Sequence, residues 1–159
     1  MSLGRARRGA WLAGLVLSLG CRHTPDDTPE GALLAWTSAM NASRSDLSQR
    51  RVAYGLLAQS ARNALTDRAA RASQFASRAL EPWELLAPGR FSLRFSIDPS
   101  NLRAEVQGDR ATVLANGHGG DHADVPMVRE DGHWRVDLAL PTPERARPRD
   151  AGPAPHDGG

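Results

Sequence analysis

The chain has 159 residues, of which 40% are hydrophobic and 24% are charged, and this composition is ordinary for one globular domain. Its formal charge of +2 includes Arg5, Arg7 and Arg8, and without the first twenty residues the formal charge is −1. Nucleic-acid binding needs clustered positive charge, so the composition argues against a nucleic-acid partner.

Residues 1–20 have the order of a secretory signal peptide: an arginine-rich start, an apolar run and small residues at its end. The apolar run from Ala10 to Gly20 would be roughly 16 Å long as a helix, against the roughly 30 Å of a bilayer's hydrocarbon core. This run is therefore too short to span a membrane, and we predict that residues 1–20 are removed.

The stretch Leu17-Ser-Leu-Gly-Cys21 resembles the lipobox of bacterial lipoproteins, although Ser18 stands where that family usually has Leu. The resemblance implies that Cys21 is the lipid-modified first residue of the mature protein, with the membrane as its partner. A diacylglycerol with a further acyl chain gives stable anchoring. Cys21 is the only cysteine, which excludes a disulfide within the chain. The alternatives are a free or buried thiol and a signal peptide that is cut elsewhere.

The lipobox resemblance also implies a location in the bacterial cell envelope, with the domain facing the periplasm. Arg22 follows the cysteine where an inner-membrane lipoprotein often has Asp, and this favours the outer membrane over the inner. We expect residues 21–27 to form the lipidated Cys and a tether, and residues 28–140 to form one domain. Residues 141–159 are rich in Pro and Gly without an apolar period, which predicts a disordered tail.

Three helices are predicted in the first half of the domain. The first begins at Asp27 or Thr28, where Pro29 suits a first turn, and it carries an apolar stripe at helical spacing. The second runs from Asp46 to Leu57. The third begins near Ser60, carries alanines at three- and four-residue steps with Phe75 beside them, and ends before Pro82. The stripe of the first helix consists of Leu33, Trp36 and Met40.

After Pro88 the apolar period changes to two, which predicts antiparallel strands that begin with 91–97. Asp131-Gly132 is typical of a type I′ hairpin turn and sets Trp134 opposite Arg129. Five strands joined by four turns then share one apolar face. Pro126 can donate no ladder bond, so we expect its strand at a sheet edge or at a bulge.

Four stretches carry a family resemblance: Tyr54-Gly-Leu-Leu, Ser60-Ala-Arg-Asn-Ala-Leu, Gly108-Asp-Arg-Ala-Thr-Val and 128–138. Through these stretches, residues 28–140 resemble the nuclear transport factor two-like fold, also called cystatin-like or ketosteroid-isomerase-like. The resemblance implies an α+β fold in which three N-terminal helices pack on one face of a curved antiparallel meander of about five strands, forming a cone. This fold hosts isomerases, cyclases, dehydratases and plain binding modules, so it does not name an activity.

The residues give little support for catalysis. Enzymes of this fold place a carboxylate or His inside the cone, whereas strand parity here puts Asp98, Asp124 and Asp137 off the apolar face or in loops. We therefore predict no enzymatic activity and no cofactor. His118, Asp121 and His122 are weak candidates for metal ligands, but they lack a fourth ligand and a rigid support, so we predict no metal.

The favoured hypothesis is a lipid-anchored, non-catalytic envelope protein whose domain binds a small apolar ligand or a partner envelope protein. One alternative is an isomerase or dehydratase of the same fold, and another is a structural accessory of an envelope complex. A cavity among the large inward residues would separate ligand binding from a purely structural role. The candidate pocket residues are Trp36, Met40, Tyr54, Phe75 and Trp134.

Overall fold

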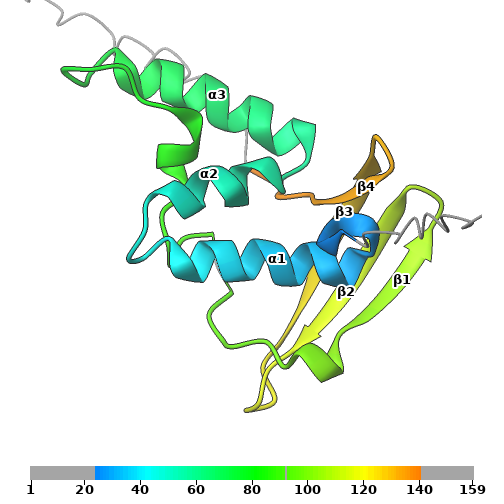
Figure 1. Ribbon diagram of the computed structural model, residues 1–159. Coiled ribbons are helices and arrows are strands. Elements are labelled where there is room, and N and C mark those ends of the chain that lie inside the picture. The colour runs from blue at the N-terminus through cyan, green and yellow to red at the C-terminus, as the bar shows by residue number, and fades with distance from the viewer. Residues whose placement is uncertain (1–23, 92, 141–159) are drawn as a thin grey trace, which may run out of the picture.

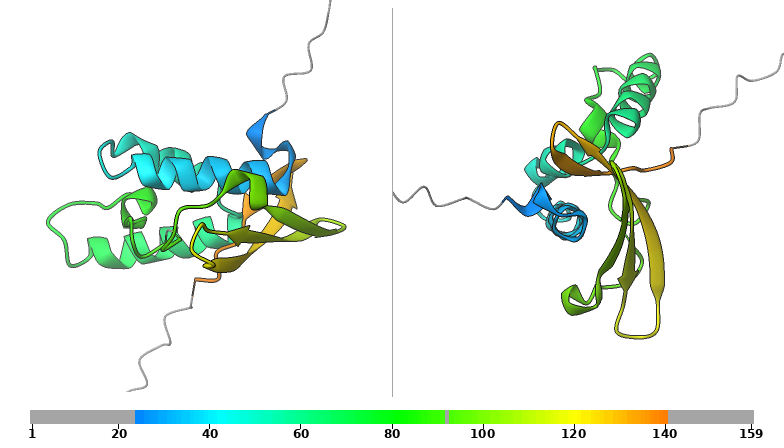
Figure 2. Two further views of the ribbon diagram at one scale, coloured as in Figure 1. Left: turned by 90° about the horizontal axis from the view of Figure 1, so that it is seen from below. Right: turned by 90° about the vertical axis from the view of Figure 1, so that its right-hand side faces the viewer.

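The computed structural model describes residues 24–91 and 93–140, which form an α+β fold with three α-helices followed by a four-stranded antiparallel sheet (Figure 1). Cys21, the signal segment and the tail lie outside the described residues. Helix α1 lies across the sheet, α2 lies beside α1, and α3 lies farther from the sheet (Figures 1 and 2). Within the described residues no helix is long and apolar enough to cross a membrane.

Helix α1 (Pro29–Ala42) begins as its sequence dictates, because the Thr28 hydroxyl accepts a hydrogen bond from the Gly31 N–H at 3.1 Å. Thr28, and not Asp27, is the capping residue. The predicted stripe is confirmed: Leu33, Trp36 and Met40 are 0%, 2% and 0% exposed. This face of α1 covers the apolar side of the sheet and forms the centre of the core.

Helix α2 (Ser48–Gly55) is shorter than predicted, and Asp46 precedes it and accepts a hydrogen bond from the Ser48 N–H at 2.9 Å. Helix α3 (Gln59–Ser73) buries Ala61, Leu65 and Ala69, so the predicted small-residue stripe is confirmed for its first three turns. After α3 the chain passes through the short helix η2 (Pro82–Leu85) and returns to the sheet.

The sheet has the strand order β1 (Arg103–Gln107), β2 (Arg110–Asn116), β3 (His122–Glu130) and β4 (His133–Val136). The predicted hairpin register is confirmed, since Trp134 faces Arg129 and Val136 faces Met127. Asp131 and Gly132 have φ values of 51° and 83°, as a type I′ turn requires. The inward residues of β2, β3 and β4 are buried against α1: Ala111, Val113, Ala115, Val125, Met127, Trp134 and Val136.

The prediction of a fifth strand over 91–97 is wrong. Among its described residues only Ile97 pairs with the sheet, through an isolated bridge to Gly117. The Glu30 side chain, on α1, accepts a hydrogen bond from the Ala104 N–H of β1 at 3.1 Å, and this donor would otherwise be open to a further strand. The alternating apolar residues still turn inward and pack half-buried against the core: Phe91, Leu93, Phe95 and Ile97.

The sheet also ends earlier than predicted on β4. Leu138 and Leu140 do not continue the ladder opposite Val125 and Ala123, although both pack partly buried against the core. Pro126 lies in β3, which is an internal strand, so its expected place at an edge or a bulge is wrong. Its missing N–H is tolerated because it lies beside the point where β4 stops, and its carbonyl still accepts from the Asp137 N–H at 2.9 Å.

The far edge of β4 is closed by the segment between α2 and α3. Leu57 forms a parallel bridge with Val136, whose N–H donates to the Leu56 carbonyl and whose carbonyl accepts from the Ala58 N–H, both at 2.9 Å. This local pairing holds the start of α3 against the sheet.

The segment directly before α1 is folded onto the domain and does not act as a spacer along its whole length. Residues Pro25–Asp27 form the short helix η1, which packs against α1 and β4. Asp26 forms an ion pair with Arg135 of β4, and both side chains are 17% exposed. The predicted tether over residues 21–27 is therefore ordered from Thr24 onward.

Candidate functional site

Of the five residues predicted to form a pocket, four pack in or against the core and one does not. Trp36, Met40 and Trp134 lie in the packed core at 2%, 0% and 4% exposure, and Tyr54 packs against that core half-buried. The Tyr54 hydroxyl lies 3.4 Å from the carbonyl oxygen of Arg62, to which it donates. These four aromatic and Met side chains thus contribute to the core, and neither cavity described below is lined by them.

Phe75 does not join them, because its side chain is 91% exposed. Helix α3 ends at Ser73, whose hydroxyl donates to the Ala69 carbonyl at 2.7 Å and accepts from the Leu80 N–H at 2.8 Å. This double contact turns the chain before the predicted stripe reaches Phe75. The alanine spacing alone did not reveal that the serine ends the helix.

The larger described cavity is a groove between the outer side of α1 and the segment 93–97, with a volume of about 480 Å³. Its size lies within the range of about 300–1,000 Å³ that small-molecule pockets occupy. We name it the α1 groove. Its described lining consists of Leu34, Thr37, Ser38, Asn41, Ala42, Leu93, Phe95, Ser96 and Ile97.

The strand-like wall of the α1 groove is fixed by Phe95. A Cβ on Gly117 would lie 2.7 Å from the Phe95 ring, so the ring packs directly on glycine backbone. The neighbouring Asp98 N–H donates to the Asn116 carbonyl at 3.0 Å, and the Asn116 amide donates to the Asn101 carbonyl at 3.0 Å. The alternating pattern of 91–97 is thus retained as a groove wall and not as a sheet strand.

None of the described residues that line the α1 groove carries a charge. Leucine, phenylalanine and isoleucine side chains supply apolar surface. The Thr37 hydroxyl donates to the Leu33 carbonyl at 2.9 Å. Within the described part of the chain, the Ser38 hydroxyl and the Asn41 amide make no hydrogen bond, so they can donate to and accept from a ligand. This chemistry suits an uncharged molecule with one apolar side.

A smaller hollow of about 240 Å³ lies over the outer residues of the sheet. In contrast to the α1 groove, it contains the charged side chains Glu105 and Arg110. The Glu105 carboxylate and the Arg110 guanidinium make this surface polar and solvated. Thr112 and Pro126 form much of the rest of the hollow. This hollow offers a matched control surface for the α1 groove.

The loop between β2 and β3 does not assemble the weak metal candidates. His118, Asp121 and His122 do not form a group of three ligands within 4.8 Å, whereas another set of described residues does. The Gly117 N–H donates to the Asp121 carbonyl at 2.8 Å and closes the loop through backbone. Hydrogen bonds from Ser100 are the main cause that lowers the pKa of Asp98, and the charge of His118 adds to this effect.

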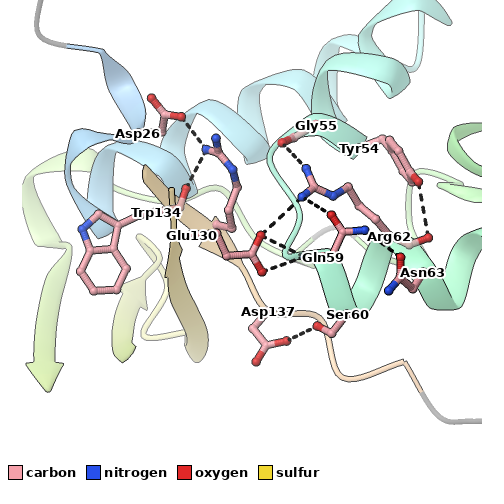
Figure 3. Close-up of polar contacts among 11 residues, drawn as sticks. Asp26, Tyr54, Gly55, Gln59, Ser60, Arg62, Asn63, Glu130, Trp134 and Asp137 are labelled. Atoms are coloured by element: carbon pink, nitrogen blue, oxygen red, sulfur yellow. Dashed lines mark hydrogen bonds and ion pairs between the residues drawn. The ribbon is translucent and has the colours of Figure 1, made fainter. Parts of the chain in front are cut away.

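Two carboxylates, Asp26 and Glu130, make contacts between segments that lie far apart in the chain (Figure 3). Glu130 accepts from the Gln59 N–H at the start of α3 and pairs with Arg62 at 3.4 Å. Burial raises the pKa of Asp26, but hydrogen bonds from Arg135 and Thr24 and the Arg135 charge outweigh it, so the net pKa lies below its usual range. Sequence reasoning missed both contacts, because each joins residues about 70 or more positions apart.

Comparison with known proteins gives no relative: no family model, no curated protein and no solved structure matches the chain.

Proposed function

We propose that the protein is a lipid-anchored, non-catalytic protein of the bacterial envelope whose domain binds a small, uncharged, largely apolar ligand in the α1 groove. The observation that carries the ligand class is the lining of the groove, which combines apolar surface with neutral hydroxyl and amide groups and carries no charge among its described residues. An ionic ligand would lose its hydration there without gaining a counter-charge.

The proposed anchor is Cys21, supported by the lipobox-like stretch that precedes it. The folded segment from Thr24 onward leaves only Arg22 and His23 between that cysteine and the domain. Two extended residues reach about 7 Å, so the domain would sit directly above the lipid headgroups. We further propose the outer membrane as its location, on the basis of Arg22.

We also infer that the domain is a reduced form of the nuclear transport factor two-like fold. Three helices that precede an antiparallel meander support this inference, as does the hairpin around Asp131-Gly132. The segment 93–97 occupies the position in sequence of the missing fifth strand. A solved homologous structure with a complete five-stranded cone whose first strand aligns with 93–97 would support the assignment, and a homologous structure with a different sheet topology would oppose it.

Ligand binding is tested by titrating the protein with a neutral solvatochromic dye and with an anionic dye of similar size. We expect the neutral dye to bind with a blue-shifted emission and the anionic dye to bind at least tenfold more weakly. Ser38→Trp places an indole in the α1 groove from an exposed helix position and should weaken neutral-dye binding at least tenfold. Thr112→Trp, in the smaller hollow, is the matched control and should leave binding unchanged.

Equal binding of the two dyes, or equal effects of Ser38→Trp and Thr112→Trp, would contradict a neutral ligand site in this groove. The anchor is tested separately by mass spectrometry of the mature protein, which should find residue 21 as an acylated first residue. An unmodified Cys21, or a mature chain that begins elsewhere, would remove the lipoprotein proposal and leave the groove proposal untouched.

A further inference from the structure

Asp26 and Asp27 of η1 and His133 of β4 come together although they are more than 100 residues apart in the chain. One ligand atom of each lies within 4.8 Å of the others, and no other group of three His, Cys, Asp or Glu residues does so in the described part of the chain. The His133 Nδ1 atom is 3.4 Å from an Asp26 carboxylate oxygen and 3.9 Å from an Asp27 oxygen.

The two carboxylates are held by groups outside this set. Arg135 donates to the second oxygen of Asp26 at 2.5 Å, and also to the Trp134 carbonyl at 3.1 Å. The first Asp26 oxygen is the one that faces His133. Thr24 donates to the two Asp27 oxygens, from its N–H and its hydroxyl, at 2.7 Å each. Such outer contacts orient metal ligands and restrict their rotation.

The Nδ1 atom of His133 is fully covered by protein and has no hydrogen-bond partner among the described residues. The rest of the ring is partly open, with the whole side chain 42% exposed. This covered nitrogen faces one carboxylate oxygen at 3.4 Å and another at 3.9 Å. It has no hydrogen-bond partner closer to it. A cation seated between these atoms would supply that partner.

The ligand chemistry selects the metal. Calcium and magnesium take oxygen ligands, whereas one imidazole nitrogen with two carboxylate oxygens suits zinc, which bonds such atoms at about 2.0–2.2 Å. Tetrahedral ligands at those distances are about 3.3–3.6 Å apart, so the 3.4 Å separation already fits and the 3.9 Å separation needs a shift of a few tenths of an ångström. The two carboxylates carry two negative charges against the one positive charge of Arg135, so the charge of these three groups together is negative.

We propose that Asp26, Asp27 and His133 bind a zinc ion that fastens the segment before α1 to the β3–β4 hairpin. Water would fill the fourth position. The site is structural and joins the start of the domain to its last strand. It does not depend on the proposed ligand groove or on lipidation.

The experiment uses the purified full chain after treatment with a chelator, titrated with zinc chloride by calorimetry and followed by thermal unfolding. We expect one zinc ion per chain and a melting temperature that rises with zinc concentration. His133→Ala and Asp27→Asn should each weaken zinc binding at least tenfold. His122→Ala removes an exposed histidine outside the site and is the matched control, so its zinc affinity should equal that of the wild type.

Magnesium chloride should leave the melting temperature of the wild type unchanged. Far-ultraviolet circular dichroism of zinc-free His133→Ala checks that the variant folds, and His133→Gln serves as a second variant that should lose zinc in the same way. Absence of stoichiometric zinc binding would overturn the proposal. Loss of binding in His122→Ala equal to that in His133→Ala would also overturn it, because the zinc would then be held elsewhere.

Discussion

The Glu130 carboxylate of β3 accepts hydrogen bonds from the Gln59 N–H at 2.9 Å and 3.1 Å, so a sheet residue caps the start of α3. The residue at the local capping position is Ala58, which has no side chain that can accept. The negative charge also lies at the positive end of the helix dipole. A tertiary contact thus replaces the missing local cap and couples α3 to the β3–β4 hairpin.

Glu130→Gln should therefore lower the free energy of unfolding by about 0.3–1 kcal/mol, the cost of losing the negative charge at the helix N-terminus, since the Gln amide oxygen can still accept from the Gln59 N–H. Urea denaturation at neutral pH measures the loss. Glu105→Gln, on the exposed outer side of β1, is the control and should change the free energy by less than about 0.5 kcal/mol. Equal small effects of the two substitutions would show that the charge of Glu130 contributes nothing at this helix end.

Trp134→Ala should destabilise the domain by about 3–5 kcal/mol, because it removes a large ring that is 4% exposed and leaves a cavity. The exposed Arg103 of β1 is the control, and Arg103→Ala should cost less than about 0.5 kcal/mol. Both are compared by chemical denaturation. Adjacent Arg135 would be a poor control, because it is 17% exposed and paired with Asp26.

Gly117→Ala should displace Phe95, since the new Cβ would lie 2.7 Å from its ring. We expect a loss of stability of about 1 kcal/mol, at the low end of overpacking because the site is only half-buried. Neutral-dye binding to the α1 groove should fall as its wall moves. In the same loop, Gly119→Ala meets its nearest atom at 3.5 Å, so it should change neither property. A Gly117→Ala protein with wild-type dye binding would show that Phe95 does not shape the groove.

The pH dependence of stability should include a contribution from Glu84. Hydrogen bonds from Arg78, and then from the Glu81 N–H, lower the pKa of Glu84 from 4.5 to about 2. A carboxyl group whose pKa is lowered by folding stabilises the folded state above its unfolded pKa, and this stabilisation disappears as pH falls from about 4.5 to about 2.

Glu84→Gln should accordingly melt at a lower temperature than the wild type at pH 7, by a small margin because the pair is solvent-exposed. The difference between the two proteins should shrink below pH 4.5 and vanish near pH 2. Arg78→Gln should give the same profile, since it removes the partner. A difference that persists unchanged at pH 2 would assign the effect to something other than this ionisation.

Local signals predicted much of the fold. Helix spacing placed Leu33, Trp36 and Met40 in the core, and the Asp131-Gly132 turn set the β3–β4 register, because both depend on chain neighbours alone. The absence of a fifth strand depends on Glu30, whose contact with Ala104 joins residues 74 positions apart. The spacing of apolar residues along the chain cannot reveal a contact between residues so far apart.

The candidate sites were harder to predict for the same reason. The pocket was expected among the largest inward side chains, but those pack against one another, and the α1 groove forms on the outer side of the helix. Its wall could be anticipated in part from the alternating 91–97 segment. The convergence of Asp26 and His133 had no local signal, because it follows from η1 folding back onto β4.

On both outer strands of the sheet, main-chain groups at the open edge are already hydrogen-bonded, which opposes the addition of a further strand. Glu30 holds the Ala104 N–H of β1, while Leu56 and Ala58 hold both main-chain groups of Val136 on β4. Exposed strand edges are templates on which a second chain can pair and aggregate. Molecules held at a surface meet one another more often than molecules in free solution. If the proposed anchor at Cys21 holds this protein on a membrane, its occupied sheet edges would keep neighbouring copies from pairing strand to strand.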